Sequence, residues 1–156
     1  MNLIKSNLAG HGLRIGIVQS RFNEPVVNKM TAACVAELHK LGVEAAHIDH
    51  ISVPGALEIP LALQALALTR EYAALIAIGA VIRGETYHFE TVANESCRGV
   101  MDVMLETGVP VANGILTTES DAQAEARVLE KGADCARAAI EMANTLATIS
   151  TLKDAR

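Results

Sequence analysis

Apolar runs and segments of helical periodicity alternate along the whole chain. Residues 13–19 are mostly apolar and predict the first strand. In the segment that follows, the apolar residues stand three or four positions apart, which predicts a helix with one buried face. These residues are Val27, Met30, Cys34, Leu38 and Leu41. Gly42 then stands where a helix commonly ends, because glycine readily adopts the left-handed conformation of a helix C-terminus.

This alternation continues through the middle of the chain. Further strands are predicted at residues 44–53, 73–81 and 109–116. The strand at 73–81 is apolar throughout, as expected for a central strand buried on both faces. Helices are predicted at 56–69 and 87–106. The buried face of the longer helix is expected to hold Phe89, Ala93, Cys97, Val100 and Met104.

Two helices are expected after the last strand. Ser120 and Gln123 have the spacing of a capping box, which predicts the start of a short helix. Gly132 is expected to break that helix, and Asp134 to cap a final helix that runs to about residue 152.

Strands that alternate with helices indicate parallel pairing with helical crossovers. We therefore expect the α/β class: a three-layer αβα sandwich around a four-stranded parallel, flavodoxin-like sheet. Residues 1–156 are expected to form a single domain, since the length fits one. Residues 1–12 fall outside this plan, and we expect them to pair with a neighbouring subunit, because an open sheet edge can accept another strand.

Composition narrows the class of function. Hydrophobic residues make up 51% of the chain and aromatic residues only 3%, so the core must be aliphatic. The net charge is −5 without a basic cluster, which argues against nucleic acid as a partner. The longest apolar stretch, 72–82, is too short to cross a bilayer, so no membrane partner is expected. No signal peptide is evident, and three scattered cysteines indicate reduced thiols. The expected location is therefore cytoplasmic.

The polar residues of the loops gather where the predicted strands end. Ligands of open parallel sheets bind beyond the carboxyl ends of the strands. The loops at this edge are residues 20–23, 54–58, 82–88 and 117–119. The sequence therefore predicts one site at this edge.

The loop at 83–86 precedes the long predicted helix. Free N–H groups and the helix dipole make such an N-terminus a candidate phosphate site, with Gly84 allowing close approach and Thr86 adding a hydroxyl. His88, one turn further, is a candidate for proton transfer near neutral pH. Considered separately, the loop at 83–86 could be a plain helix cap, and His88 could be an ordinary surface histidine.

Four other residues are candidates for binding. Glu58 follows a Pro-Gly turn and suits a polyhydroxyl chain, although an exposed first-turn glutamate is equally expected. Phe22, in the loop after the first strand, is placed to stack on a heterocycle or to enter the core. Arg127 and Lys131 flank the predicted break between the last helices and are candidates for phosphate or a ring edge. Basic residues near a helix C-terminus are common without such a role.

Metal and cofactor sites are not expected. His47 and His50 are three positions apart on a predicted strand, where such a pair points to opposite faces. The chain contains neither a G-x-G-x-x-G fingerprint nor a P-loop. A classical site for a dinucleotide or a nucleoside triphosphate is therefore not expected.

Five blocks together resemble the lumazine synthase family of riboflavin biosynthesis. They are R-F-N at 21–23, V-P-G-A-L-E-I-P at 53–60, I-G-A-V-I-R-G-E-T-Y-H-F-E at 78–90, G-I-L-T-T-E at 114–119 and K-G-A-D-C-A-R-A-A-I-E-M-A-N at 131–144. The resemblance spans residues 2–146. It implies the condensation of 5-amino-6-(D-ribitylamino)uracil with 3,4-dihydroxy-2-butanone 4-phosphate to 6,7-dimethyl-8-ribityllumazine, without a cofactor.

The resemblance also implies roles for individual residues. Proton transfer falls to His88, with Arg127 and Lys131 assisting at the phosphate and the ring. Phe22 would stack on the pyrimidine and Glu58 would hold the ribityl chain. The remaining implied binding residues are Asn23, Gly55, Ala56, Leu57, Ala80, Val81, Ile82, Glu85, Thr86 and Asn113.

Two departures from the family pattern stand out. Relatives often carry an aromatic residue where Asn113 stands, and the stretch from Arg127 to Lys131 is shorter than the usual Gly- and Lys-containing loop. The resemblance implies a homo-oligomer, most simply a pentamer, in which Asn113, Arg127 and Lys131 reach the site from a neighbour. The short stretch favours free pentamers over an icosahedral shell. A non-catalytic lumazine- or flavin-binding protein, or a shell protein of the same fold, is the alternative reading.

Overall fold

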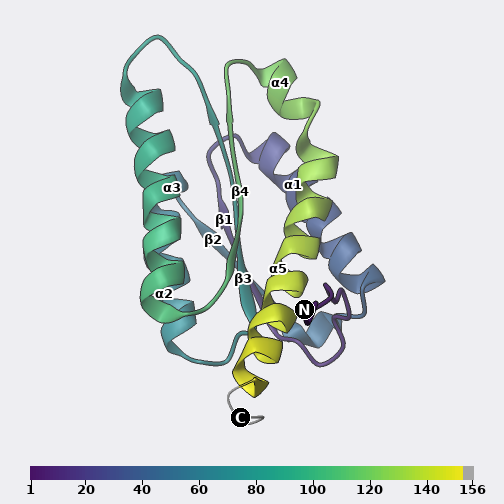
Figure 1. The fold of residues 1–156 in the computed structure, drawn as a ribbon. Coiled ribbons are helices and arrows are strands. Elements are labelled where there is room, and N and C mark those ends of the chain that lie inside the picture. The colour runs from purple at the N-terminus through teal and green to yellow at the C-terminus, as the bar shows by residue number, and fades with distance from the viewer. Residues whose placement is uncertain (153–156) are drawn as a thin grey trace.

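The structure is a computed structural model that describes residues 1–152. Its centre is one four-stranded sheet in which all three strand pairings are parallel. The strands are β1 (Ile15–Ser20), β2 (Ile48–Val53), β3 (Ala74–Ile82) and β4 (Val111–Thr118). They lie in the order β2-β1-β3-β4 (Figure 1). This is the strand order of flavodoxin-like folds, as predicted.

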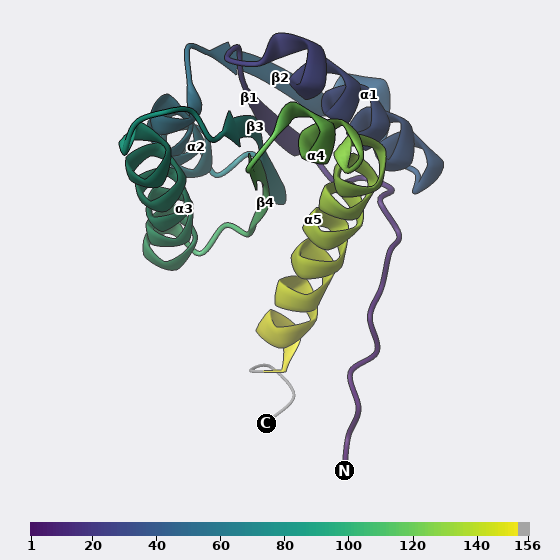
Figure 2. The same cartoon turned by 90° about the horizontal axis from the view of Figure 1, so that it is seen from above.

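Helices cover both faces of the sheet. They are α1 (Glu24–Lys40), α2 (Ile59–Leu68), α3 (His88–Thr107), α4 (Asp121–Glu125) and α5 (Val128–Thr151), with short 3-10 helices η1 (Ala45–His47) and η2 (Ala56–Glu58). Seen from above, α1 and α5 lie on one side of the sheet and α2 and α3 on the other (Figure 2). The predicted three-layer sandwich is confirmed.

The sheet separates two hydrophobic cores, and β3 contributes to both. Its Ile76 and Ile78 side chains pack toward α1 and α5, whereas Leu75 and Ala77 pack toward α2 and α3. All four are fully buried. A strand enclosed on both faces has no place for a polar side chain, which explains the unbroken apolar run in the sequence.

Two predicted starts differ from the structure by three or more residues, and the other strand boundaries differ by one or two. The strand expected from residue 44 begins at Ile48, because the ladder with β1 starts at the pair Ile15–Ile48 and the residues before it form η1. The helix expected from residue 56 starts as η2, and α2 follows with Pro60 in its first turn. Proline fits there because a first-turn N–H has no partner inside the helix.

The predicted inward face of α3 was partly wrong. Phe89, Val100 and Met104 do pack against the core, but Cys97 is exposed. Ser96 is fully buried in its place, and its hydroxyl donates to the Ala93 carbonyl at 3.4 Å. A serine whose hydroxyl is satisfied within its own helix can occupy a buried position, which apolar periodicity does not detect.

The predicted break at Gly132 and cap at Asp134 were also wrong. Helix α5 runs without interruption from Val128 through both residues. The capping box before α4 is present, with the Gln123 N–H donating to Ser120 Oγ at 3.3 Å. Gly132 is buried against α1: a Cβ atom there would lie 2.4 Å from the Met30 carbonyl oxygen. The glycine therefore serves close helix packing and does not terminate a helix.

The amino edge of the sheet is closed by a polar cluster. Arg14 donates to Asp49 Oδ2 at 2.8 and 3.0 Å, and the Tyr72 hydroxyl donates to the same oxygen at 2.9 Å. The hydrogen bond from Arg14, joined by that from Tyr72, lowers the pKa of Asp49. These groups satisfy one another and join the starts of β1 and β2 to the residues before β3.

The N-terminal segment does not join the sheet of its own chain. Residues 1–10 have no regular secondary structure, and they run along α5, away from the strands (Figure 2). Asn144 Nδ2 donates to the carbonyls of Asn7 and Ala9, and the Gly10 N–H donates to Leu41 O. Leu3 and Ile4 are exposed. Pairing of this segment with a neighbouring subunit stays a prediction.

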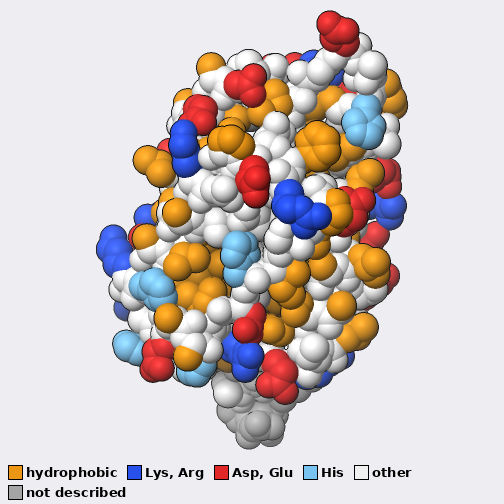
Figure 3. All heavy atoms as spheres, turned by 180° about the vertical axis from the view of Figure 1, so that it is seen from behind, with side chains coloured by type: hydrophobic (Ala, Val, Ile, Leu, Met, Phe, Trp, Pro, Cys, Tyr) orange, Lys and Arg blue, Asp and Glu red, His pale blue; other side chains and the backbone are white. Residues whose placement is uncertain are grey.

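The three cysteines are free thiols. Burial raises the pKa of Cys34 to about 12 and that of Cys135 to about 11, so both remain protonated at neutral pH. Across residues 1–152, no helix is both long and apolar enough to cross a membrane. The face opposite to that of Figure 1 mixes apolar, acidic, basic and histidine side chains, without a region of one charge sign (Figure 3).

We predict that Gly132→Ala destabilises the protein, although alanine is the better helix former by about 1 kcal/mol. The added methyl group would collide with the backbone of α1, and overpacking of this kind costs about 1–3 kcal/mol. Thermal unfolding at equal protein concentration measures the effect. Gly84→Ala is the matched control, because a Cβ atom at Gly84 meets nothing within 4 Å. An unchanged or higher Tm for Gly132→Ala would contradict the close contact between the helices.

Candidate active site

A cavity of about 430 Å³ opens at the carboxyl edge of the sheet, where β1 and β3 end. Most of the predicted binding residues line it. They are Phe22, Asn23, Gly55, Ala56, Leu57, Glu58, Ala80, Val81, Ile82, Thr86 and His88. Neighbouring strands β1 and β3 run on to helices on opposite faces, and this point is where open α/β sheets bind ligands.

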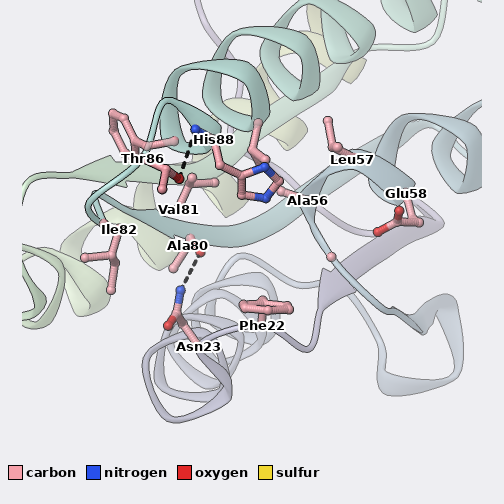
Figure 4. A pocket seen from close by; sticks show the side chains of 14 residues that line it. Phe22, Asn23, Ala56, Leu57, Glu58, Ala80, Val81, Ile82, Thr86 and His88 are labelled. Atoms are coloured by element: carbon pink, nitrogen blue, oxygen red, sulfur yellow. Dashed lines mark hydrogen bonds between the residues drawn. The ribbon is translucent and has the colours of Figure 1, made fainter.

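The loop after β1 presents Phe22 to the cavity. Asn23 adopts the left-handed conformation with φ 57°, and its side-chain amide donates to the Ala80 carbonyl at 2.9 Å. This bond ties the start of α1 to the end of β3. Phe22 is 73% exposed, so it is not a core residue. Its ring borders the open space in front of β3 (Figure 4).

The turn after β2 presents Glu58. Residues 56–58 form η2, with Ala56 buried and Glu58 exposed in the first turn. The Glu58 carboxylate is turned toward the cavity (Figure 4). An exposed first-turn glutamate and a ligand-binding glutamate are therefore compatible descriptions of the same side chain.

The start of α3 forms the third wall. His88 is the first residue of α3, and its imidazole projects into the cavity on the side opposite to Phe22 (Figure 4). Within the described chain, the side chain of Tyr87 at the N-cap makes no capping hydrogen bond, and the His88 N–H reaches only Thr86 Oγ1, at 3.4 Å. Backbone donors at this helix end are thus available to an anion. Glu85 lies in the same loop but does not line the cavity.

The three other predicted residues lie in a separate hollow of about 390 Å³. Asn113 from β4 lines it together with Arg127 and Lys131 from the start of α5. The Arg127 Nη1 group donates to the carbonyl of Gln123, in the middle of α4, at 2.8 Å. Among residues 1–152, none lines both hollows. One chain therefore brings the predicted residues together as two groups and not as one.

Sequence reasoning missed the side chain that connects the two groups. Arg83, directly after β3, forms ion pairs with Glu90 of α3 and with Glu119 after β4. The hydrogen bond from Arg83 lowers the pKa of Glu90. Phe89 and Val92 also line the first cavity; Phe89 was expected only as a core residue, and no role was predicted for Val92. An arginine followed by an acidic residue seven positions later was the available signal.

Among residues 1–152, no group of three or more His, Cys, Asp or Glu side chains is arranged to hold a metal ion. The fold and the first cavity define a doubly wound α/β protein with a cavity at the strand-order switch between β1 and β3, the position at which such folds commonly bind small molecules.

Comparison with known proteins places the chain in a family. The sequence model described as 6,7-dimethyl-8-ribityllumazine synthase matches residues 12–147. Proteins of that name from Cupriavidus metallidurans and Cupriavidus necator are 59% and 61% identical over 96% and 95% of this chain, and over 89% of their own lengths. One from Ralstonia nicotianae is 60% identical over 96% of this chain and 91% of its own. The chain belongs to the 6,7-dimethyl-8-ribityllumazine synthase family.

Proposed function

We propose that this chain is the transferase that condenses 5-amino-6-(D-ribitylamino)uracil with 3,4-dihydroxy-2-butanone 4-phosphate, giving 6,7-dimethyl-8-ribityllumazine, phosphate and water. The observation that carries the proposal is the single cavity that gathers Phe22, Glu58 and His88 beside the uncapped start of α3. Its volume suits a small ligand.

The cavity offers a place for each part of the first substrate. Phe22 provides an exposed face for the pyrimidine ring. Ala80, Val81 and Ile82 line the same cavity, and their backbone groups would form hydrogen bonds with the edge of the ring. The ribityl chain would lie along residues 55–58, where the Glu58 carboxylate accepts hydrogen bonds from hydroxyl groups.

The phosphate of the second substrate would lie at the start of α3. The free N–H groups and the positive end of the helix dipole favour an anion there. Glu85 lies in this segment and would contribute its backbone N–H, and Thr86 would add a hydroxyl donor. The guanidinium of Arg127 would complete the phosphate site from a neighbouring subunit, because its own chain places it in the other hollow.

His88 would transfer protons during the reaction. The amine of the uracil attacks the ketone and water leaves to form an imine; phosphate is then eliminated, and attack by the ribitylamino nitrogen closes the ring with loss of the second water. His88 lines the cavity beside the expected phosphate position, and histidine is the side chain that most often acts as a general acid or base. Most of the acceleration would come from holding two substrates in reacting geometry, since the steps themselves are chemically easy.

We propose a cytoplasmic homo-oligomer, a pentamer, with sites between subunits. The separation of the two hollows supports shared sites. Met101 and Leu105, on the outer side of α3, are 50% and 79% exposed, which favours a covered helix face. The N-terminal residues 1–12 would add to a neighbour's sheet. A head-to-tail interface of this kind closes into a ring.

Free pentamers are favoured over a shell. Helix α4 ends at Glu125 and α5 begins at Val128, so the connection has no room for the longer loop of many relatives. A non-catalytic lumazine- or flavin-binding protein is the alternative, but it would not need a histidine beside the expected phosphate position. Mixing both substrates and measuring lumazine absorbance with phosphate release tests the proposal directly.

We predict that His88→Ala lowers kcat while the Kd for the ribityl-uracil changes little, because proton transfer is lost and the ring contacts remain. Loss of a general acid–base typically costs about 10²–10⁴-fold, with the low end expected where positioning dominates. Steady-state kinetics and titration of the substrate separate the two quantities. Wild-type turnover in a folded variant would remove His88 from the mechanism.

Shared sites predict complementation between two impaired variants. His88→Ala and Arg127→Ala chains, mixed under conditions of subunit exchange, should regain activity, because about one quarter of the interfaces in random rings then combine intact residues from both partners. Unmixed variants at the same concentration are the controls. Analytical ultracentrifugation gives the size of the particle. Full activity of a wild-type monomer would be incompatible with sites between subunits.

We predict that Asn113→Phe tightens binding of the ribityl-uracil. Asn113 is exposed and faces the second hollow, so an aromatic ring there would supply a second stacking face opposite a neighbour's Phe22. Aromatic stacking is worth about 0.5–1.5 kcal/mol beyond buried area. Calorimetric titration measures the change, with Asn113→Leu as an apolar control. Equal gains for Leu and Phe would indicate simple burial, and weaker binding of Phe would place the side chain away from the ring.

A further inference from the structure

Arg83 stands at the junction of the two hollows. It directly follows β3, and its N–H donates to the Thr118 carbonyl at 2.9 Å, which extends the pairing of β3 and β4 by one residue. The side chain is 37% exposed and lines neither cavity. Arg83 is therefore not expected to contact a substrate directly.

The guanidinium of Arg83 holds the first turn of α3. Its Nη1 group donates to Glu90 Oε1, and its plane lies over the Phe89 ring with Cζ 4.3 Å from the centroid. Phe89 lines the first cavity next to His88. The other carboxylate oxygen of Glu90 is buried and, within the described residues, has no hydrogen-bond partner. Arg83 thus pairs with a partly exposed Glu90 and fixes the direction of its carboxylate.

The Nε side of the same guanidinium is connected by hydrogen bonds to the second hollow. Arg83 Nε donates to Glu119 Oε2 at 2.5 Å. The Glu119 N–H donates to Gln123 Oε1 at 2.8 Å, and the Gln123 carbonyl accepts from Arg127 Nη1 at 2.8 Å. Three hydrogen bonds, joined through the side chains and backbones of Glu119 and Gln123, therefore link Arg83 to the guanidinium of Arg127 in the second hollow. On its other side Arg83 packs on Phe89, which lines the first cavity.

We propose that Arg83 is a positioning residue that couples the two half-sites of one subunit, by fixing the start of α3 on one side and, through Glu119 and Gln123, Arg127 on the other. This inference rests on the proposed function. In a ring with shared sites, the two half-sites of one chain serve two different active sites. Arg83 would thus set the phosphate geometry of both.

Such a role differs from a contribution to global stability. Exposed ion pairs stabilise a fold only slightly. Catalysis is more sensitive, because small displacements of positioned groups reduce rates strongly. Arg137 is the matched control: it also pairs with two carboxylates, Glu37 and Asp134, at 41% exposure, and it lines neither hollow.

The first experiment compares Arg83→Met, Arg83→Lys, Glu119→Gln and Arg137→Met in the steady state. We expect Arg83→Met to raise the KM for the butanone phosphate and to lower kcat, each on the order of 10-fold, with an unchanged Kd for the ribityl-uracil and a Tm shift like that of Arg137→Met. Arg83→Lys should recover little, since an ammonium group cannot reach two carboxylates and an aromatic face together. Glu119→Gln should raise the same KM with a smaller effect on kcat.

The second experiment separates the two arms by complementation. In one mixture, chains with His88→Ala and Arg83→Met are combined with Arg127→Ala chains; the restored site then meets the Arg83 change only through Arg127. In the other, chains with Arg127→Ala and Arg83→Met are combined with His88→Ala chains, so that the change acts only through α3. Coupling predicts that both mixtures regain less activity than the parent mixture.

The outcomes are decisive. If only the second mixture loses activity, Arg83 serves its own α3 alone and the coupling is overturned. Kinetics of Arg83→Met and Glu119→Gln that match Arg137→Met overturn the positioning role even where subunits do not exchange. Failure of the wild type and of Arg137→Met to form lumazine overturns the proposed function itself. Titration with inorganic phosphate then still tests Arg83: weaker binding by Arg83→Met but not by Arg137→Met supports it, and equal binding overturns it.

Discussion

The enclosure of a parallel sheet by helices on both faces governs the rest of the molecule. The strands exchange their backbone hydrogen bonds with one another, and β3 presents buried aliphatic side chains to two cores at once. Chemistry that needs polar groups is therefore confined to the two edges of the sheet. At the amino edge Arg14, Asp49 and Tyr72 satisfy one another, whereas at the carboxyl edge Phe22, Glu58 and His88 face an open cavity.

The same enclosure divides the candidate site. The layer of α2 and α3 brings His88 and Glu58 to a cavity in front of β3, while α5, on the other face, brings Arg127 and Lys131 to a hollow beside β4. Packed layers cannot slide to unite these groups within one chain, since close-packed cores resist such displacement. A neighbour that placed its second hollow against the first cavity would remove this separation without any change of fold, and this is the physical reason for which we propose shared sites.

Periodicity was enough to predict the order and kind of the strands and long helices, because each layer imposes its own spacing of apolar residues. The errors have two causes. Gly132 looks like a helix break but allows α5 to approach the backbone of α1, a contact that is distant in sequence. Ser96 is buried where Cys97 was expected because its hydroxyl is satisfied within its own helix, which apolar periodicity does not detect. The cavity residues were predictable as a set from the family motifs, but the role of Arg83 was not, since Glu119 lies 36 positions away.

An uncapped helix start is useful to a phosphate site and unfavourable to the fold. A side-chain cap at Tyr87 would stabilise α3 by about 1 kcal/mol, but it would occupy the donors that an anion needs. The described chain has no such cap there, and Arg83 holds the first turn from outside through Glu90 and Phe89. The start of α3 is thus positioned by a guanidinium that lies next to the cavity but does not line it. The donors stay free for the ligand, and the position of the helix end becomes dependent on the loop that follows β4.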